Sequence, residues 1–502
     1  MKTTTFCLFL IFGFLGLAFI SEGQSQNQPN IILLLGDDHG WDETGYNGHP
    51  YLKTPVLDEL AKTGVRMNRF YSASPVCSPT RGSILTGRHP NRYGTFTPGF
   101  SIRPEEISIA QLLQSQGYAT AHFGKWHVGP VKASSPTNPG ALGFDEWLSH
   151  DNFFEMNPAL SRNGADPEIF EGESSEILVR EAKKFIKQSI AGGKPFFVVI
   201  WYGSPHEPYS GLEEDLGLYE DLPDTFATKT VRLTSNETGS PVERLQRDVL
   251  QERFAEITAM DRSIGELRGF LKEENLRSNT LFWYFGDNGT PREANATVPF
   301  REEKGSIYEG GIRVPSVLEW PNKIDESLIL DVNMNSSDVF PTICDILEIP
   351  LPNRPIDGIS LLPWLEGAST PRPRTMKFWN GRPQNPQTAA TYIDPKLQEG
   401  TSPLVKLMNG KATRDFRNYI QTEIIPSDFL GARAIIDNQY KLVIQEDDEG
   451  RPVLELFDLS VDQSESKNIV KDYPELAQNL QEELRIWQQS VLESLIGKDY
   501  KK

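Results

Sequence analysis

Cysteine is scarce in this chain, which has only three among its 502 residues. Cys7 lies in the N-terminal segment, so Cys77 and Cys344 remain for the rest of the protein. Two distant cysteines do not supply the disulfide framework that is common in animal extracellular and lysosomal enzymes. The count therefore favours a bacterial exported protein. Cys344 stands in an apolar stretch and is predicted to be a buried helical thiol without a chemical role.

Long hydrophobic runs are also missing. The apolar run from Phe6 to Ile20 has 15 residues, too few for a confident transmembrane helix. Lys2 precedes it, and the small residues Ser21 and Gly23 follow it, as at a signal-peptide cleavage site. Residues 1–23 are therefore predicted to be the signal peptide of a periplasmic or secreted protein, with an uncleaved anchor as the alternative. No lipobox-like cysteine precedes the expected cut, so we expect no stable membrane association.

Positive charge is in deficit, because 50 Lys and Arg stand against 69 Asp and Glu and leave a net charge of −19. This balance argues against a general nucleic-acid-binding protein, which needs a basic face. It does not exclude an anionic substrate, since a few cationic side chains or a metal ion can dominate one pocket. The remaining composition is that of a globular protein long enough for two domains.

Apolar runs that end in glycine or polar residues recur through residues 24–370 and predict the buried strands of a largely parallel sheet. The strands are expected at 30–36, 65–71, 118–123, 196–201, 280–285 and 317–320. Helical spacing of apolar residues predicts helices at 54–64, 107–116, 174–190, 242–274 and 337–347. This alternation predicts an α/β fold.

The composition changes at residues 371–403, which are rich in Pro, Asn, Arg and Gln and predict a boundary or a long loop. Short strands of an antiparallel sheet are expected after it, at 432–436, 440–444 and 453–458. An amphipathic helix is expected at 474–495. We therefore expect a main domain at residues 24–370 and a smaller C-terminal subdomain at 371–502.

Oxygen-bearing side chains follow two of the predicted core strands. Asp37 and Asp38 come directly after the strand at 30–36, and Asp287 and Asn288 come just after the strand at 280–285. Each pair alone is compatible with a solvated loop, a helix cap or an Asn-Gly turn. Two pairs at the carboxyl ends of core strands, where α/β folds place their ligands, instead predict one site for a hard divalent cation.

Groups suited to catalysis stand near the ends of other predicted elements. Cys77 and Arg81 lie at a helix start, which is compatible with a reactive cysteine or with a small buried thiol. Lys125 and His127 alternate, so both side chains can face one pocket. His206 lies on a stiff loop between two prolines, a good position for proton transfer. Taken singly, Lys125, His127 and His206 are more often ordinary surface or loop groups, and Cys77 is as often a small buried thiol as a reactive one.

Together these motifs resemble the type I sulfatases, in the family's order and over nearly the whole mature chain. The resemblance rests on Asp37-Asp38, Cys77-x-Pro79-x-Arg81 with Leu85-Thr86-Gly87-Arg88, Gly124-Lys125-Trp126-His127, the His206 loop, Gly286-Asp287-Asn288-Gly289 and Lys304 with Glu309-Gly310-Gly311-x-Arg313. It implies an alkaline-phosphatase-like three-layer sandwich with a large, mostly parallel central sheet. It also implies that a formylglycine-generating or sulfatase-maturating enzyme oxidises Cys77 to formylglycine, an aldehyde.

The resemblance further implies which residues bind the cation and the sulfate group. The cation, Ca²⁺ or else Mg²⁺, is expected on Asp37, Asp38, residue Cys77 as formylglycine, Asp287 and Asn288. The sulfate is expected to be surrounded by Arg81, Lys125, His127, His206 and Lys304. A hydroxyl of the hydrated aldehyde is expected to attack sulfur with help from Asp287. His206 and Lys304 are expected to act on the leaving oxygen, and His127 to accept the proton before sulfate release.

The resemblance is strongest to bacterial polysaccharide sulfatases and to N-acetylgalactosamine-6-sulfatases, which implies a sulfated carbohydrate with galactose or N-acetylgalactosamine units. The segments 144–166, 209–241 and 376–403 are expected to shape the sugar site. Aromatic candidates for stacking on sugar rings are Trp147, Phe153, Phe154, Trp379 and Tyr392, although each taken alone is more often packed in the ordinary way. Two alternatives stay open: a phosphatase or phosphodiesterase of the same fold, and a glycan-binding relative without catalysis.

Overall fold

The structure is a computed structural model that describes residues 28–500 except 236, 237, 239, 296, 297, 382–389, 406, 408 and 409. The predicted signal peptide at residues 1–23 lies outside the described residues. Among the residues described, no helix combines the length and the apolar character needed to cross a bilayer.

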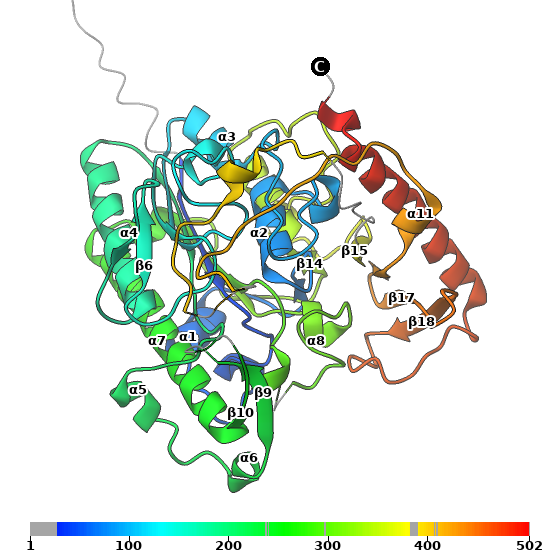
Figure 1. Ribbon diagram of the computed structural model, residues 1–502, viewed down its shortest axis with the longest axis horizontal. Coiled ribbons are helices and arrows are strands. Elements are labelled where there is room, and N and C mark those ends of the chain that lie inside the picture. The colour runs from blue at the N-terminus through cyan, green and yellow to red at the C-terminus, as the bar shows by residue number, and fades with distance from the viewer. Residues whose placement is uncertain are drawn as a thin grey trace, which may run out of the picture.

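A sheet of ten strands forms the centre of the protein (Figure 1). The strand order is β13-β2-β12-β11-β1-β8-β4-β5-β6-β7. Five adjacent strands are parallel, namely β11 (Thr280–Gly286), β1 (Asn30–Gly36), β8 (Phe196–Trp201), β4 (Ala119–Lys125) and β5 (Glu146–His150). These strands are almost entirely buried. The apolar runs predicted burial for β11, β1 and β8, whereas β5 was not predicted as a strand.

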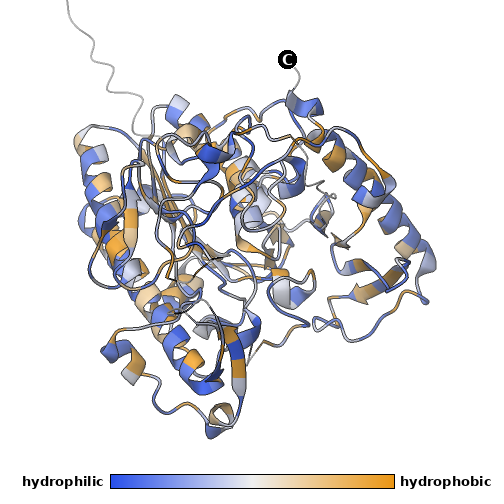
Figure 2. Cartoon of the chain, viewed as in Figure 1, coloured by the Kyte–Doolittle hydropathy of each residue, from blue (hydrophilic) through white to orange (hydrophobic). Residues whose placement is uncertain are grey.

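Helices cover both faces of this sheet, which confirms the three-layer sandwich. One face packs against α1 (Pro55–Thr63), α4 (Ser174–Ala191) and α7 (Gln246–Glu273). The other packs against α2 (Cys77–Thr86), α3 (Ile109–Ser115) and α9 (Val339–Ile346). Figure 2 shows hydrophobic and hydrophilic residues alternating around the long helices, as expected of helices with one face on a core.

The remaining elements are short. The strands are β2 (Val65–Met67), β3 (Phe70–Tyr71), β6 (Ala159–Arg162), β7 (Glu168–Ile169), β9 (Thr230–Thr234), β10 (Pro241–Leu245), β12 (Ser316–Glu319), β13 (Leu328–Leu330) and β14 (Met334–Asn335). The helices are α5 (Glu213–Gly217), α6 (Asp224–Ala227), α8 (Glu309–Ile312) and α10 (Leu362–Leu365).

Two elements differ from the sequence prediction by more than two residues at a boundary, and strand pairing explains both. The single strand expected at 65–71 is two strands, because β2 joins the main sheet whereas β3 pairs with β14. The helix expected from residue 242 begins at Gln246, because residues 241–245 form β10 and pair with β9. Apolar spacing alone does not reveal such partners.

A separate sheet of four antiparallel strands lies in the C-terminal region, in the order β15-β16-β17-β18. The strands are β15 (Met376–Asn380), β16 (Ala432–Asp437), β17 (Tyr440–Glu446) and β18 (Pro452–Asp458). Helix α11 (Pro474–Leu495) packs on this sheet through leucines of one face. The first strand, β15, falls in the segment that was expected to be a boundary loop, and we propose that the subdomain begins just before it, near residue 370.

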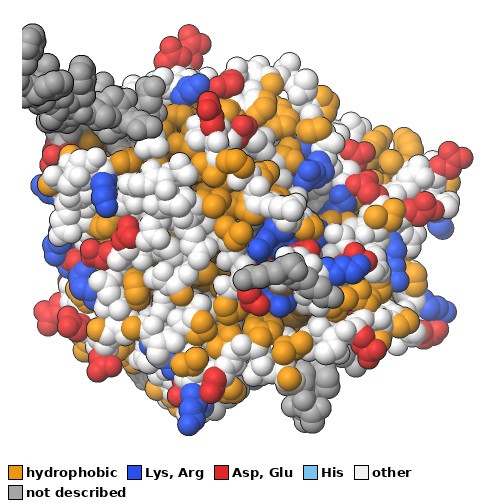
Figure 3. Space-filling view, turned by 90° about the horizontal axis from the view of Figure 1, so that it is seen from above, with side chains coloured by type: hydrophobic (Ala, Val, Ile, Leu, Met, Phe, Trp, Pro, Cys, Tyr) orange, Lys and Arg blue, Asp and Glu red, His pale blue; other side chains and the backbone are white. Residues whose placement is uncertain are grey.

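Residues 390–431 connect β15 to β16 by a long excursion, which crosses the main domain as the yellow-to-orange trace of Figure 1. Backbone hydrogen bonds fix part of it: Arg417 N donates to Gly99 O at 2.9 Å, and Ser101 N donates to Arg417 O at 3.1 Å. These bonds hold part of the C-terminal region against the main domain, so this region contributes surface to it. On the face shown in Figure 3, basic and acidic side chains are interspersed around apolar ones.

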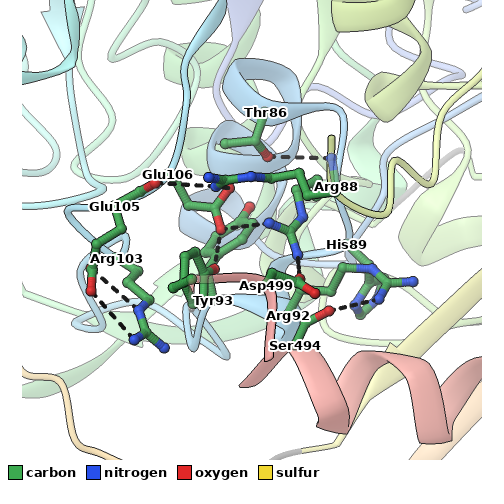
Figure 4. Close-up of polar contacts among 12 residues, drawn as sticks. Thr86, Arg88, His89, Arg92, Tyr93, Arg103, Glu105, Glu106, Ser494 and Asp499 are labelled. Atoms are coloured by element: carbon green, nitrogen blue, oxygen red, sulfur yellow. Dashed lines mark hydrogen bonds and ion pairs between the residues drawn. The ribbon is translucent and has the colours of Figure 1, made fainter. Parts of the chain in front are cut away.

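A buried ionic cluster also joins the end of the chain to the main domain (Figure 4). Arg88, which ends the Leu-Thr-Gly-Arg turn, donates to Glu106 at 2.9 Å and pairs with Asp499. Glu106 also accepts the hydroxyl of Tyr500 and lies 3.5 Å from Arg354. Both Arg88 and Glu106 are buried, so each depends on its partner for charge compensation.

Glu106→Gln is therefore expected to lower the free energy of unfolding by about 3 kcal/mol, because it leaves buried cations without their full counter-charge. Denaturant unfolding measures this change. The matched control is Glu105→Gln, since Glu105 is exposed and pairs with Arg103 at 3.2 Å. The control is expected to change stability by less than about 1 kcal/mol. Equal stabilities of the two variants would show that the cluster does not hold the C-terminal end.

Candidate active site

The segments that follow β1, β8 and β11 leave the sheet at the same edge. Gly36 lies in register with Gly286, so Asp37 and Asp287 emerge side by side. Asp287 N donates to Gly36 O at 3.0 Å, and Asp38 N donates to Asp287 Oδ1 at 2.9 Å. The convergence that the sequence predicted follows from parallel pairing, because the carboxyl ends of parallel strands lie together.

Cys77 is the first residue of α2 and lies among these carboxylates. Its Sγ and carboxylate oxygens of Asp37 and Asp287 lie within 4.8 Å of one another, and a second such group joins Sγ to Asp38 and His206. Burial raises the pKa of the Cys77 thiol to about 11, although Lys125 and Lys304 act in the opposite direction. An unmodified thiol here is therefore protonated at neutral pH, and the helix start does not make it the activated thiolate that its position suggested.

Three buried or partly buried cations bind the carboxylates. Arg81, one turn along α2, donates to Asp287 Oδ2 from Nε at 3.1 Å and from Nη2 at 2.7 Å. Lys125 Nζ donates to Asp37 at 2.5 Å, and Lys304 Nζ donates to Asp38 at 2.5 Å. Each carboxylate thus has its own cation, and Lys304 keeps 21% of its side chain exposed on the open side of the site.

The carboxylates do not ionise with equal ease. Burial opposes the charge of Asp37, but the Lys125 and Arg81 cations outweigh it and hold its pKa below the usual range. Burial, together with the negative charge of Asp37, raises the pKa of Asp287 to about 7. The raised pKa of Asp287 shows that the adjacent acids repel one another despite their three cations, and a divalent cation bound between them would relieve this repulsion.

The donor set fits a hard cation. Asn288 Nδ2 donates to Asp38 Oδ1 at 2.9 Å, whereas Asn288 Oδ1 is buried without a hydrogen-bond donor among the described residues. A buried amide oxygen that no partner contacts raises the free energy of the folded protein. Asn288 Oδ1 is therefore suited to bind a cation. Asp37, Asp38, Asp287 and Asn288 supply oxygen atoms alone, as Ca²⁺ or Mg²⁺ requires.

Two histidines border the cluster as neutral rings. His206 Nε2 lies 3.6 Å from Asp38 Oδ2, and its ring stacks on Phe153 with centroids 5.3 Å apart. Burial lowers the pKa of His206 to about 3. His127 has a left-handed backbone with φ of 60°, and neither ring nitrogen has a hydrogen-bond partner among the described residues. Burial and Lys125 hold the pKa of His127 well below its usual value.

The structure therefore brings together the whole predicted set, namely Asp37, Asp38, Cys77, Arg81, Lys125, His127, His206, Asp287, Asn288 and Lys304. The expected sugar-stacking role fails for most of the aromatic candidates. Trp147, Phe153, Phe154 and Trp379 expose 9% or less of their surface and pack inside the protein. Tyr392 is half-buried, and Arg103 lies over its ring at 5.1 Å.

Sequence reasoning missed the residues that support the site from behind. Arg253 on α7 donates from Nη2 to Asp38 O at 2.6 Å and from Nη1 to Pro205 O. It forms a buried ion pair with Glu43, at 2.6 Å from Nε to Oε1. Arg253 therefore joins the Asp38 turn to the His206 loop. An arginine on a long polar helix is usually exposed, and the sequence carries no signal for this role.

Comparisons with known proteins agree with this geometry. A family model described as Sulfatase matches residues 29–349. An ulvan-active sulfatase from Formosa agariphila is 30% identical over 345 residues, which cover 68% of this chain and 65% of that protein. An N-acetylgalactosamine-6-sulfatase from Sus scrofa is 32% identical over 384 residues, which cover 69% and 67% of the two chains. The chain thus spans just under two thirds of the Formosa relative.

The fold is shared with a solved structure of Ps i-CgsB. The TM-score is 0.73 at 22% identity, and the match covers 92% of this chain and 93% of the other. At this identity the match supports the fold alone. The family model, by contrast, spans well over half of the 502 residues and includes every residue of the site. The chain belongs to the sulfatase family.

Proposed function

We propose that this protein hydrolyses sulfate esters of a sulfated carbohydrate, with residue 77 as formylglycine. The observation that carries the proposal is the position of Cys77: it is fully buried among three acids, three cations and two neutral imidazoles. Sulfatases generally use a formylglycine and a divalent cation. Here the oxygens of Asp37, Asp38, Asp287 and Asn288 would hold the cation, which we take to be Ca²⁺.

When present, the aldehyde supplies a hydrated oxygen nucleophile, and the cation supplies a Lewis acid. The chain's own residues bind and orient the ester. Arg81 and Lys125 are fixed by Asp287 and Asp37, so their charge stays in place as negative charge shifts onto the sulfate oxygens. Trp201 supports Arg81 from below, with the guanidinium 5.2 Å from the ring centroid.

Proton transfer falls to the groups on the open side of the cluster. Lys304 is partly exposed. Burial lowers its pKa, but the Asp38 carboxylate outweighs burial and raises the pKa above the usual range. Lys304 therefore stays charged. Lys304 and His206 are the side chains placed to act on the leaving oxygen. His127, with two free ring nitrogens among the described contacts, is placed to accept a proton from residue 77.

The proposed substrate has sulfated galactose or N-acetylgalactosamine units, supported by the relatives named for ulvan and for N-acetylgalactosamine 6-sulfate. Protein produced together with a maturation enzyme should release sulfate from such oligosaccharides. It should release phosphate from an aryl phosphate at least about 100-fold more slowly than sulfate from the matching aryl sulfate. The reason is that the site is complementary to the charge of the sulfate transition state, and the phosphate transition state carries a different charge. Faster phosphate release would instead establish a phosphatase.

The proposal includes export by the segment at residues 1–23 and conversion of Cys77 by a maturation enzyme of the host. The intact mass of the protein purified from its host tests the first point. A mass that includes residues 1–23 would overturn cleavage of this segment.

A further inference from the structure

Arg414 differs from the other buried arginines in having no counter-charge within the part of the chain that the structure describes. It exposes 9% of its surface, and it forms no hydrogen bond or ion pair with any residue that the structure describes. The other buried arginines each pair with a carboxylate: Arg81 with Asp287, Arg88 with Glu106, Arg92 with Asp357, Arg253 with Glu43, Arg268 with Glu319, Arg313 with Glu309 and Arg372 with Asp338. No nitrogen of Arg414 is among the buried polar atoms that lack a partner, so the guanidinium reaches solvent from a largely buried side chain.

This arginine is held close to the catalytic cluster. It lies on the excursion at 390–431, which is joined to the main domain at Gly99 and Ser101. Ile102, which follows Ser101, donates its N–H at 2.8 Å to the carbonyl oxygen of Val128. Val128 is the residue after His127. The charge of Arg414 contributes to lowering the pKa of His127, and it interacts with Cys77 as well. The backbone contacts and this electrostatic effect together place Arg414 near His127.

The loop that carries Arg414 is rigidly placed. Asp151, at the end of β5, accepts the N–H groups of Thr401 at 2.6 Å and Ser402 at 2.7 Å. Gly400 packs against the Arg414 carbonyl so closely that a Cβ would lie 2.0 Å from its oxygen. Phe416 N donates to Gln398 O at 2.8 Å. The guanidinium is thus presented by a fixed backbone, as a binding residue requires.

A cavity of about 420 Å³ lies beside the guanidinium, lined by Pro98, Gly99, Thr413, Arg414 and Phe416 among others. Gly99 contributes no side chain, and a Cβ there would lie 3.4 Å from Arg414 Nη2. The other cations that line the cavity are already engaged. Lys411 pairs with Asp415, and the Arg417 guanidinium lies 4.3 Å from the ring centroid of Phe100. Arg414 remains as the cation open to a ligand.

We propose that Arg414 binds a second anionic group of the substrate, a carboxylate or a second sulfate, on a sugar next to the reacting ester. A guanidinium presents a planar pair of donors that matches both groups. The inference rests on the proposed function, because the first anion is the sulfate bound near residue 77. It makes the enzyme selective for sugars with two negative groups.

The test compares Arg414→Gln with the wild type on three sulfated sugars. One carries a single sulfate, one also carries a uronate carboxylate, and one carries a second sulfate. The variant should lose on the order of 100-fold in kcat/KM on a doubly charged substrate relative to the singly charged one, as expected for a buried charged contact. The loss should lie in KM. Loss with the uronate identifies a carboxylate as the ligand, and loss with the disulfated sugar identifies a sulfate.

Two controls separate a binding role from a structural one. Arg414→Lys keeps the charge without the planar pair and should restore part of the lost selectivity. Arg451→Gln changes an exposed arginine of the C-terminal region that does not line this cavity, and it should leave selectivity unchanged. An unchanged ratio in Arg414→Gln, or an equal loss on all three sugars, would overturn the proposal. Wild-type protein that cleaves no sulfate ester at all would instead refute the proposed function.

Discussion

Cys77→Ala is expected to abolish repeated hydrolysis of sulfate esters, with a loss of at least about 10⁴-fold in kcat, as is typical when a nucleophile is removed. The variant has no side chain to convert to the aldehyde, whereas the cation cluster around it stays complete. Alanine fits the space of a buried thiol, so the free energy of unfolding should change by only about 1 kcal/mol. Initial rates with an aryl sulfate and a denaturant titration measure the two quantities.

The chain offers a matched control in Cys344, the other free and buried thiol among the described residues. Cys344 lies on α9 in the hydrophobic core and belongs to neither of the two groups of potential metal ligands around Cys77. Cys344→Ala should keep wild-type turnover. A Cys77→Ala variant that turns over as fast as Cys344→Ala would contradict the assignment of residue 77 as the nucleophile.

Asp287→Asn is expected to weaken binding of the divalent cation by on the order of 100-fold and to lower kcat by about 10³-fold or more. Asp287 joins helix α2 to the turn after β1, since it accepts two hydrogen bonds from Arg81 and one from Asp38 N. Asparagine keeps the shape of the side chain but removes the charge that attracts the cation. Calorimetric titration with Ca²⁺ measures affinity independently of activity.

The matched control is Asp261→Asn on α7. Asp261 is also buried, and burial likewise raises its pKa to about 7. It binds the N–H groups of Val56 and Leu57 at the start of α1 and lies outside the carboxylate cluster. Its substitution should leave Ca²⁺ affinity unchanged. Equal loss in the two variants, or none in Asp287→Asn, would refute the cation site.

The sequence predicted the core of the site because parallel strands bring distant motifs together. Asp37 and Asp287 are far apart in the chain, yet the runs before them are strong strand signals and their carboxyl ends meet. Cys77 and Arg81 were singled out at a predicted helix start, and their roles came from the resemblance to the sulfatase signature. These signals are local, so they can be read without knowledge of the tertiary structure.

What the sequence did not predict depends on tertiary contacts. Strand β15 is five residues long in a Pro-rich stretch and is defined by pairing with β16 more than fifty residues later. Trp379 and Phe154 resemble exposed binding residues by type, but packing from other segments buries them. Arg253 and Arg414 act at the site from α7 and from the C-terminal excursion. No local pattern distinguishes them from the many arginines on the surface.

The most direct test of the account is the mass of the tryptic peptide from Phe70 to Arg81, from protein purified out of its native host. The account predicts the mass of a peptide in which the thiol of Cys77 has become an aldehyde, in the fraction that hydrolyses sulfate esters. An active preparation in which this peptide carries only the unmodified thiol would contradict it.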